Sequence, residues 1–309
     1  MALLFYSQFD DPVEWSGHLR RLMPELEVRV WPDVGDLADI ESALVWKAPE
    51  GELARCPALK LIVNLGAGVD SIVADRSLPA GVPIVRIADP EMSRMMAQFV
   101  LLAVLRHHRN IVAFERAQRE RRWNYIHPKE TRETTVGIMG LGNLGAVAAA
   151  ELVRQGFTVR GWSRTPKSLA GVASFHGEGG LPAFLDGLNV LVAMLPYTPQ
   201  TDGLVGAQVF DALPRGACFV SVGRGRTVDE DALVEALKSG RVAEATLDVF
   251  REEPLPPQHP LYSFDQVLVT PHLASVAIPR SAAEQVVENI RRVRDGRPLL
   301  NQVDPQRGY

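Results

Sequence analysis

The chain contains little cysteine: Cys56 and Cys218 are its two cysteines among 309 residues. Two cysteines cannot form the framework of disulfides that stabilises many small secreted proteins. Both lie in apolar surroundings, which predicts buried, reduced thiols and favours a cytoplasmic location.

Long hydrophobic segments are also missing. The longest apolar run in the most apolar stretch, Phe99–Leu105, is far shorter than the roughly 20 residues that span a bilayer. The first residues, Met1–Phe5, are apolar, but no basic residues precede them and Asp10 and Asp11 follow soon after. We therefore expect a first strand rather than a signal peptide, and no membrane partner.

Neither sign of charge is in large excess. Lys and Arg total 33 against 37 Asp and Glu, so the formal net charge is -4 and no nucleic-acid partner is predicted. The basic, aromatic stretch Arg119–Tyr125 is local, and we expect an exposed arm or a subunit contact there. The hydrophobic content of 46% is that of a soluble globular protein, and the length suggests two domains.

Short apolar runs alternate with helix-compatible segments, which favours α/β domains with parallel sheets. In the first ninety residues the predicted strands are Leu3–Tyr6, Val28–Val30, Ala43–Trp46, Leu61–Asn64 and Ile84–Arg86. A second series has predicted strands at Thr135–Met139, Thr158–Trp162, Val190–Met194, Cys218–Val222, Ala245–Val249 and Val267–Thr270. Six strands of this kind match a complete dinucleotide-binding sheet.

Helices are predicted where Gly and Pro are absent or where end signals occur. Met92–Ala117 contains neither residue, which predicts one long helix that connects two lobes. In the predicted helix Glu230–Ser239, Asp229 is placed to cap the N-terminus and Gly240 to end the helix. Arg280–Asp295 has apolar residues at helical spacing.

A glycine-rich turn follows the apolar run Val136–Met139 and opens the alanine-rich predicted helix Leu144–Gln155. In this context the three glycines permit a tight turn, the approach of a pyrophosphate and close helix packing, in that order. Amides at the helix start then bind phosphate. The predicted residues of this site are Gly140, Gly142, Asn143, Leu144 and Gly145.

An acidic residue is missing where NAD sites usually have one, about 20 residues beyond the glycine turn. The second strand of this series ends with Ser163, Arg164 and Thr165. Arg164 can pair with a 2′-phosphate and stack on adenine, while the two hydroxyls can donate hydrogen bonds. This predicts NADP as the preferred cofactor with NAD possible; the alternative is a solvated Arg164 on a turn.

Three chemically active side chains follow three later strands of this series: Arg224, Glu253 and His272. Ligands of open α/β sheets bind beyond the carboxyl ends of strands. Arg224 can bind a carboxylate and polarise a neighbouring carbonyl, and His272 can donate a proton as hydride arrives. Glu253 can orient the imidazole and favour its charged form. The set suits reduction of a 2-oxo acid.

These residues lie in blocks that carry a family resemblance over nearly the whole chain. The blocks are Asn64–Asp70, Gly140–Gly145, Val222–Arg226, Asp248–Leu255 and Thr270–Ser275. The chain resembles the D-isomer-specific 2-hydroxyacid dehydrogenases, most closely their glyoxylate/hydroxypyruvate reductase branch. The resemblance implies that Arg224, Glu253 and His272 are catalytic and that Asp248 binds the nicotinamide carboxamide. It also implies a homodimer joined through the cofactor domain.

Further contacts to cofactor and substrate are predicted alongside this resemblance. The remaining cofactor residues are Leu195, Pro196, Val222, Gly223 and Ser275; the substrate residues are Trp46, Leu65, Gly66, Ala67, Gly68, Arg224 and His272. The resemblance implies that the Gly66–Gly68 backbone binds the substrate carboxylate, and small residues at a strand end leave amides open to an anion. A purely structural turn is the alternative.

Some of these roles stay open. Trp46 is placed in the substrate pocket by resemblance alone, because a single Trp at a strand end is more often a core residue. Arg226 either supplements the anion site or is solvated. The chain also departs from the wider family, with Gln98 in place of a common Glu and Ser221 and Val222 where an Asn is usual. Neither departure touches the proposed proton chemistry.

The expected architecture is two Rossmann-like parallel-sheet domains with the active site in the cleft between them. Residues 1–98 with 274–309 form the predicted substrate-binding domain, and 99–273 the NAD(P)-binding domain. The predicted activity is NADPH-dependent reduction of a small 2-oxo acid such as glyoxylate or hydroxypyruvate, without a metal. The alternatives are a dehydrogenase for a larger 2-oxo acid and a dinucleotide-sensing regulator with little turnover.

Overall fold

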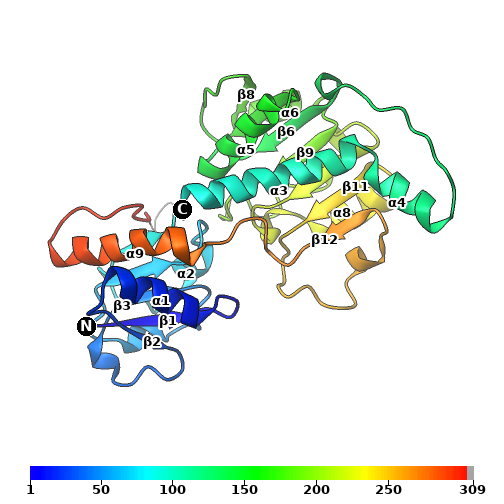
Figure 1. Cartoon of the computed structure of the whole chain (residues 1–309). Coiled ribbons are helices and arrows are strands. Elements are labelled where there is room, and N and C mark those ends of the chain that lie inside the picture. Colours follow the sequence, from blue (N-terminus) through cyan, green and yellow to red (C-terminus); the bar gives the residue numbers. More distant parts are fainter. Residues whose placement is uncertain (305–309) are drawn as a thin grey trace. The chain divides into compact units, whose positions relative to one another are not determined.

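The computed structural model describes residues 1–304, which form two compact units. One unit consists of Met1–Met92 together with the chain from Val276 onward, and the other of Ser93–Ser275. Each unit is built on its own parallel sheet (Figure 1). The last five residues of the predicted substrate-binding domain lie outside the described residues. The functional division at 98/99 and 273/274 stays a proposal.

The described part of the first unit has a five-stranded sheet in the order β2-β1-β3-β4-β5, with every neighbouring pair parallel. Its strands are β1 (Ala2–Tyr6), β2 (Glu27–Val30), β3 (Ile40–Val45), β4 (Leu61–Asn64) and β5 (Ile84–Arg86). Helices α1 (Pro12–Leu22) and α9 (Pro279–Arg294) pack together on one face, where Trp15 and Ala283 join Phe5 in one core (Figure 1). The two ends of the chain therefore build this core together.

The opposite face of this sheet has short elements in place of long helices. They are η1 (Leu37–Asp39), η2 (Leu53–Arg55) and α2 (Asp70–Ala74). Leu53 and Ile72 pack there with Leu4 and Ile62 of the sheet. Because side chains alternate along a strand, Leu4 and its neighbour Phe5 enter opposite cores.

The described part of the second unit has a seven-stranded parallel sheet in the order β12-β11-β10-β9-β6-β7-β8. The strands are β6 (Thr135–Met139), β7 (Thr158–Ser163), β8 (Val172–His176), β9 (Val190–Ala193), β10 (Ala217–Ser221), β11 (Val242–Leu247) and β12 (Val267–Val269). Counted from β6, six strands follow the doubly wound order 3-2-1-4-5-6, and β12 extends the sheet. The strand order reverses between β6 and β9, which is where such sheets bind ligands.

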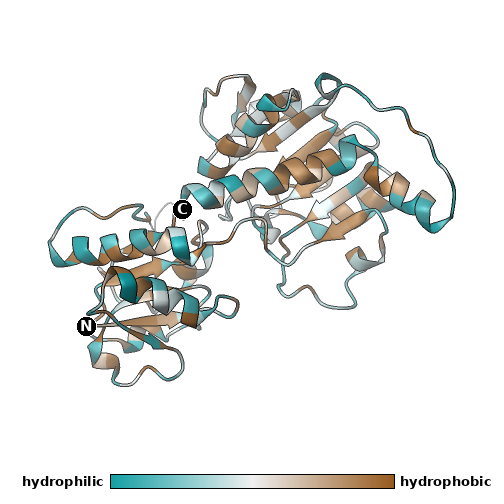
Figure 2. Cartoon of the chain, in the orientation of Figure 1, coloured by the Kyte–Doolittle hydropathy of each residue, from teal (hydrophilic) through white to brown (hydrophobic). Residues whose placement is uncertain are grey.

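Helices cover both faces of this sheet, as parallel strands require. The helical segments from residue 90 to residue 263 are α3 (Pro90–His108), α4 (Ile111–Arg119), α5 (Asn143–Arg154), α6 (Gly177–Leu185), α7 (Ala207–Ala212) and α8 (Glu230–Lys238), with η3 (Thr131–Glu133), η4 (Gly225–Thr227) and η5 (Pro260–Ser263). Residues of α3 and α5 share a core with Val136 and Val220, and residues of α6, α7 and α8 share one with Phe219. Figure 2 shows the strands as mainly hydrophobic and the helices as mixed.

The prediction of one helix over Met92–Ala117 is wrong. The chain forms α3 and α4, and the break lies at Arg109 and Asn110. Asn110 has a φ of 56°, in the left-handed region, which is incompatible with a continuous right-handed helix. Asparagine tolerates this conformation better than most residues, so a single side chain inside a good helical sequence sets the break.

The predicted second series of strands lacks β8, which the structure adds at the edge of the sheet. Its residues are exposed or half-buried, so it has no apolar run that would mark a strand. The other predicted strands are present, with ends displaced by a few residues in some of them. The predicted cap of α8 is confirmed, because the Asp229 carboxylate accepts a hydrogen bond from the Ala232 N–H at 3.1 Å.

The structure also bears on the predictions about the two cysteines and about membrane spans. Cys56 and Cys218 are both buried and neither forms a disulfide. No helix within residues 1–304 has the length and hydropathy that a membrane span requires.

Candidate active site

The glycine turn lies between β6 and α5, at the point where the strand order reverses. Gly140 has a φ of 116°, and a Cβ there would lie 2.7 Å from the Met194 carbonyl oxygen. A Cβ on Gly145 would lie 1.9 Å from the Gly140 carbonyl oxygen. The backbone alone therefore requires glycine at these two positions, which gives the tight turn and the close packing that the sequence predicts.

Gly142 differs from Gly140 and Gly145, the other two glycines of the turn. Its φ of -77° suits any residue, and a Cβ there would meet no atom of residues 1–304 within 4 Å apart from its own residue and its two chain neighbours. The fold would accept a side chain at this position, so its absence leaves open space over the start of α5. The first amides of a helix have no intrahelical partner, and Gly142 offers no side chain to cap them. This space fits a dinucleotide pyrophosphate next to Asn143 and Leu144.

The predicted ribose site lies beside this turn. The Gly140 N–H donates a hydrogen bond to the Trp162 carbonyl at 2.8 Å, which joins the turn to the end of β7. The buried Ser163 hydroxyl donates to the Thr165 carbonyl at 2.7 Å and shapes the next turn. Arg164, between these residues, is exposed and can reach an anion in solvent. Residues 161–165, at the end of β7, include no acidic residue, which suits a 2′-phosphate better than a ribose hydroxyl.

The segment Met194–Pro196 follows β9 and lies against both loops. A Cβ on Gly223 would lie 2.6 Å from the Leu195 carbonyl oxygen, so glycine lets the loop after β10 approach this segment. The Pro196 carbonyl accepts a hydrogen bond from the Thr201 hydroxyl at 2.7 Å. The predicted residues Leu195, Pro196, Val222 and Gly223 therefore lie along the carboxyl edge of β9 and β10.

Arg224 begins the next part of the site. Its Nη1 donates to the Gly223 carbonyl at 3.0 Å, and η4 follows. A Cβ on Gly225 would lie 1.9 Å from the carbonyl carbon of Phe250. Glycine at 225 is thus needed for the Arg224 loop to contact the loop after β11, which carries Glu253.

His272 and Glu253 form a direct pair. The His272 Nδ1 lies 2.9 Å from the Glu253 Oε2, and the Glu253 Oε1 accepts the Phe250 N–H at 3.0 Å. The two side chains are 24% and 19% exposed, so the pair is partly shielded but open to a ligand. The carboxylate fixes the orientation of the ring through Nδ1 and leaves Nε2 as the nitrogen turned away from Glu253.

Asp248 organises the loop that carries His272. Its buried carboxylate accepts hydrogen bonds from the Thr270 hydroxyl at 2.6 Å and from the N–H groups of Leu273 and Ala274 at 2.8 and 2.9 Å. The Asp248 carbonyl accepts the His272 N–H at 2.9 Å. His272 has a left-handed φ of 57°, a costly conformation for a side chain of this size, and these bonds maintain it. The sequence did not show this role.

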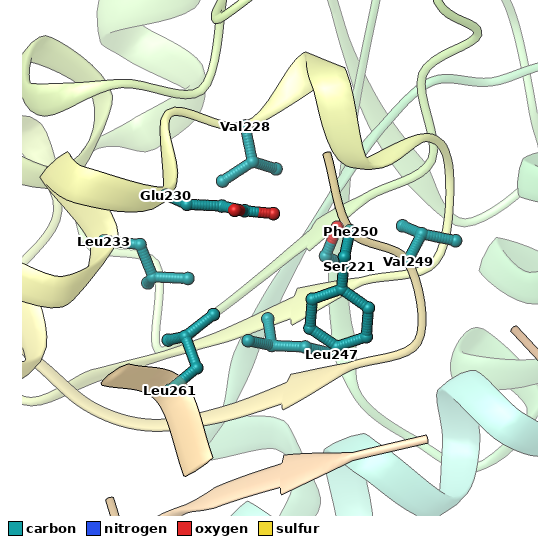
Figure 3. A pocket seen from close by; sticks show the side chains of 8 residues that line it. All are labelled: Ser221, Val228, Glu230, Leu233, Leu247, Val249, Phe250 and Leu261. Carbon is teal, nitrogen blue, oxygen red and sulfur yellow. The ribbon is translucent and has the colours of Figure 1, made fainter. Parts of the chain in front are cut away.

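Glu230, at the start of α8, supports the loop that carries Glu253. Its Oε1 accepts the Arg251 N–H at 2.7 Å, and its Oε2 lies 3.4 Å from His259 Nε2. Figure 3 shows this side chain reaching across a small pocket toward Ser221 and Phe250. The pocket is lined mainly by apolar side chains: Val228, Leu233, Leu247, Val249, Phe250 and Leu261. The Glu253 loop is therefore held at Phe250 and at Arg251.

In the first unit, the backbone carbonyls of the loop after β4 accept hydrogen bonds from side chains. The buried Asn64 side chain donates to the carbonyls of Gly66 and Gly68 at 2.8 and 2.9 Å, and Arg86 donates to that of Ala67 at 3.4 Å. Within residues 1–304, the N–H groups of Gly66, Ala67 and Gly68 make no hydrogen bond. Three neighbouring unsatisfied amides are typical of an anion-binding loop.

Trp46 packs directly on this loop. A Cβ on Gly66 would lie 2.3 Å from Cζ3 of the Trp46 ring, so glycine makes room for the indole. The ring is half-buried, and the Lys47 ammonium lies 5.9 Å from its centroid. Leu65 is buried beneath the loop. The structure thus groups Trp46 with Leu65, Gly66, Ala67 and Gly68, all in the first unit.

Two of the predicted residues remain, Ser275 and Arg226. Ser275 directly follows the backbone amide of Ala274 that Asp248 binds. Arg226 is exposed; its guanidinium lies 4.5 Å from the centroid of the Tyr197 ring and 3.7 Å from Asp202. These contacts favour the solvated alternative for Arg226 over a role at the anion site.

A doubly wound sheet with this glycine turn at its switch point, and with a buried carboxylate and a His–Glu pair on nearby strand ends, defines an NAD(P)-dependent oxidoreductase. Residues 101–274 match the family model of the D-isomer specific 2-hydroxyacid dehydrogenase, NAD binding domain. The chain is 41% identical to glyoxylate/hydroxypyruvate reductase A of Yersinia enterocolitica, with 100% of each chain covered.

Solved structures of similar proteins indicate the same family. A D-isomer specific 2-hydroxyacid dehydrogenase from Xanthobacter autotrophicus, in complex with NADPH and MES, is 58% identical, with a TM-score of 0.94 over 100% of this chain and 99% of that one. An NADPH-dependent glyoxylate/hydroxypyruvate reductase from Sinorhizobium meliloti, in complex with NADP and sulfate, is 36% identical, also with a TM-score of 0.94 and the same coverage. The chain belongs to the D-isomer specific 2-hydroxyacid dehydrogenase family. The resemblance predicted from the sequence is thereby confirmed.

Proposed function

We propose that the protein reduces a small 2-oxo acid, such as glyoxylate or hydroxypyruvate, to the 2-hydroxy acid with NADPH. The observation that carries the proposal is the His272–Glu253 hydrogen bond at the carboxyl edge of a dinucleotide-binding sheet. A protein that only binds a dinucleotide has no use for a proton donor oriented by a carboxylate. The named relatives that are glyoxylate/hydroxypyruvate reductases support the same reaction class.

The bound cofactor supplies hydride to the carbonyl carbon of the substrate. Arg224 binds the substrate carboxylate through its planar, permanently charged fork and polarises the carbonyl beside it. His272 donates a proton from Nε2 to the carbonyl oxygen, while Glu253 holds Nδ1 and stabilises the charged ring. The balance is one 2-oxo acid, one NADPH and one proton giving one 2-hydroxy acid and one NADP⁺.

The cofactor site is proposed to extend along the carboxyl edge of the second unit. Gly142, Asn143 and Leu144 would hold the pyrophosphate, and Arg164 would pair with the 2′-phosphate. The open space at Gly142, the exposed guanidinium of Arg164 and the two relatives solved with NADPH or NADP support this arrangement. Asp248 keeps its loop in place and has a further lone-pair direction for the predicted carboxamide contact.

The substrate site is proposed to include the amides of Gly66–Gly68 for the carboxylate and the Trp46 ring as a limit on side-chain size. The unsatisfied amides support the first role, and the packing of the indole on Gly66 supports a fixed ring position for the second. A bulky fixed ring favours substrates with small side chains. The homodimer and the cytoplasmic location stay predictions.

The proposal is tested by following NADPH and NADH oxidation with a panel of 2-oxo acids of increasing size, for the unmodified protein and for Arg164→Ala. Glyoxylate and hydroxypyruvate are expected to give the highest kcat/KM, and NADPH to be preferred. Loss of the charge-assisted bonds to the 2′-phosphate costs about 1.5–3 kcal/mol, so Arg164→Ala should raise the NADPH KM about 10- to 100-fold.

NADH is the internal control, because it lacks the 2′-phosphate and its parameters should not change in Arg164→Ala. An unchanged cofactor ratio in this variant would remove Arg164 from the phosphate site. A preference for larger 2-oxo acids would favour the dehydrogenase alternative. Absence of turnover with every 2-oxo acid, with NADPH bound, would favour the regulator.

A further inference from the structure

A second cluster of chemically active side chains lies in the second unit, apart from the proposed active site. His107 comes from α3, Cys218 from β10 and Glu244 from β11. One nitrogen, sulfur or oxygen atom from each of the three lies within 4.8 Å of the other two. Sequence spacing does not reveal this group, because His107 and Cys218 are 111 positions apart.

The fold brings the three together by strand register and helix periodicity. Cys218 and Glu244 are partners across the β10–β11 pair. Cys218 belongs to the core under α3, together with Val100, Ala103 and Val104. His107 is three residues after Val104 and four after Ala103, so it continues the same helical stripe. A histidine therefore stands where the packing pattern calls for an apolar residue.

The cluster is distinct from the proposed catalytic group. Cys218 is the second residue of β10, and Val222 at the carboxyl edge lies four residues further on. At about 3.3 Å per residue, this separation is about 13 Å along the strand. None of the three residues contributes to the glycine turn or to the loops of Arg224, Glu253 and His272.

Two polar atoms of the cluster are buried without a hydrogen bond. The His107 Nδ1 and the Glu244 Oε2 are each inaccessible to solvent, and neither makes a hydrogen bond within residues 1–304. They lie 3.5 Å apart, at ion-pair distance. Buried polar atoms in native proteins are nearly always satisfied, so a pair of this kind points to a group that binds both.

The three atoms match the ligands that Zn²⁺ prefers. Imidazole nitrogen, thiolate and carboxylate oxygen bind Zn²⁺ at about 2.0–2.3 Å, and the ligands of one tetrahedral ion lie about 3–4 Å from one another. The His107 and Glu244 atoms are already at 3.5 Å, and atoms of the cluster that lie farther apart, up to 4.8 Å, would move closer on binding. A thiolate and a carboxylate together balance the charge of the ion. We propose that His107, Cys218 and Glu244 bind one Zn²⁺ ion, with water as the fourth ligand, and so join the end of α3 to β10 and β11.

The charges and the exposure around the cluster fit this assignment. Arg106, the next residue to His107, is paired with Glu115 at 3.0 Å, and this pair offsets its positive charge. The His107 and Glu244 side chains are 21% and 16% exposed, which provides an entry path and room for water.

The test uses the full chain, freed of metal with a chelator. Separate samples are titrated with Zn²⁺ and with Co²⁺. One ion should bind per chain, raise the thermal midpoint, and with Co²⁺ give a thiolate-to-metal charge-transfer band in the near ultraviolet. Cys218→Ser should abolish this band. It should also weaken Zn²⁺ binding at least 10- to 100-fold, the loss that even an outer partner of a metal site causes.

Cys56→Ser is the matched control, since Cys56 is the other buried free thiol and lies in the first unit. It should keep both the band and the affinity. If Cys218→Ser fails to fold, Glu244→Gln keeps the side-chain size and should weaken Zn²⁺ binding by a similar factor. A Co²⁺ complex without the thiolate band, or equal Zn²⁺ affinity in the unmodified protein and Cys218→Ser, would overturn the proposal.

Discussion

Replacing His272 by alanine is expected to lower kcat for glyoxylate reduction about 10²–10⁴-fold, the usual contribution of a positioned proton donor. The imidazole Nδ1 lies 2.9 Å from the Glu253 Oε2, so the carboxylate fixes the ring that donates the proton. NADPH binding should be unchanged, because the glycine turn and Arg164 are elsewhere on the edge. Steady-state rates and fluorescence titration with NADPH measure the two quantities separately.

Two further variants separate chemistry from loop structure. His272 has a left-handed φ, so His272→Asn keeps a residue that tolerates this conformation while it removes the proton donor. It should lose as much activity as His272→Ala. His127, which is exposed and follows the Arg119–Tyr125 stretch, provides a matched control. His127→Ala should keep its rate, and near-normal rates in both His272 variants would refute the proton-donor role.

Replacing Arg224 by glutamine is expected to lower kcat/KM for glyoxylate about 10²–10³-fold, a loss typical for removal of a donor that stabilises developing negative charge. Glutamine keeps a hydrogen-bond donor but has neither the charge nor the fork geometry for a carboxylate. Both KM and kcat should change, since the proposed role covers the ground-state carboxylate and the polarised carbonyl. The measurement is initial rate against glyoxylate concentration at saturating NADPH.

Arg226 is the matched control for this substitution, two residues away on the same loop. It lies over the Tyr197 ring and beside Asp202, so Arg226→Gln should keep kcat/KM within a few fold. Equal losses in the two variants would mean that the loop needs its net charge rather than a specific guanidinium. A larger loss of kcat/KM in Arg226→Gln than in Arg224→Gln would assign the carboxylate-binding role to Arg226 instead.

The parts of the site that could be predicted from the sequence are those set by local backbone needs. Gly140 and Gly145 have conformations or contacts that exclude a side chain, and such requirements leave a fixed spacing in the sequence. Strand ends were also predictable, because the buried strands are apolar and polar residues begin where they stop. The sequence alone therefore predicts that Arg224, Glu253 and His272 lie at one edge of the sheet.

Other features depend on tertiary contacts that leave no local pattern. The hydrogen bonds of Asp248 to the His272 loop join residues more than twenty positions apart. Cys218 meets Glu244 through strand register, which periodicity does not determine. The break between α3 and α4 rests on the left-handed conformation of Asn110, in a segment whose composition favours one helix.

The central claim is that the protein reduces a small 2-oxo acid with NADPH. Following the transferred hydride with deuterium tests this claim most directly. NADPH carrying deuterium at the transferable position is incubated with glyoxylate and the protein, and the product is examined by mass spectrometry and NMR. The proposed function predicts glycolate with one deuterium at C2 for each NADPH oxidised. Cofactor oxidation without deuterium in the product, or NADPH binding without turnover of any 2-oxo acid, would contradict it.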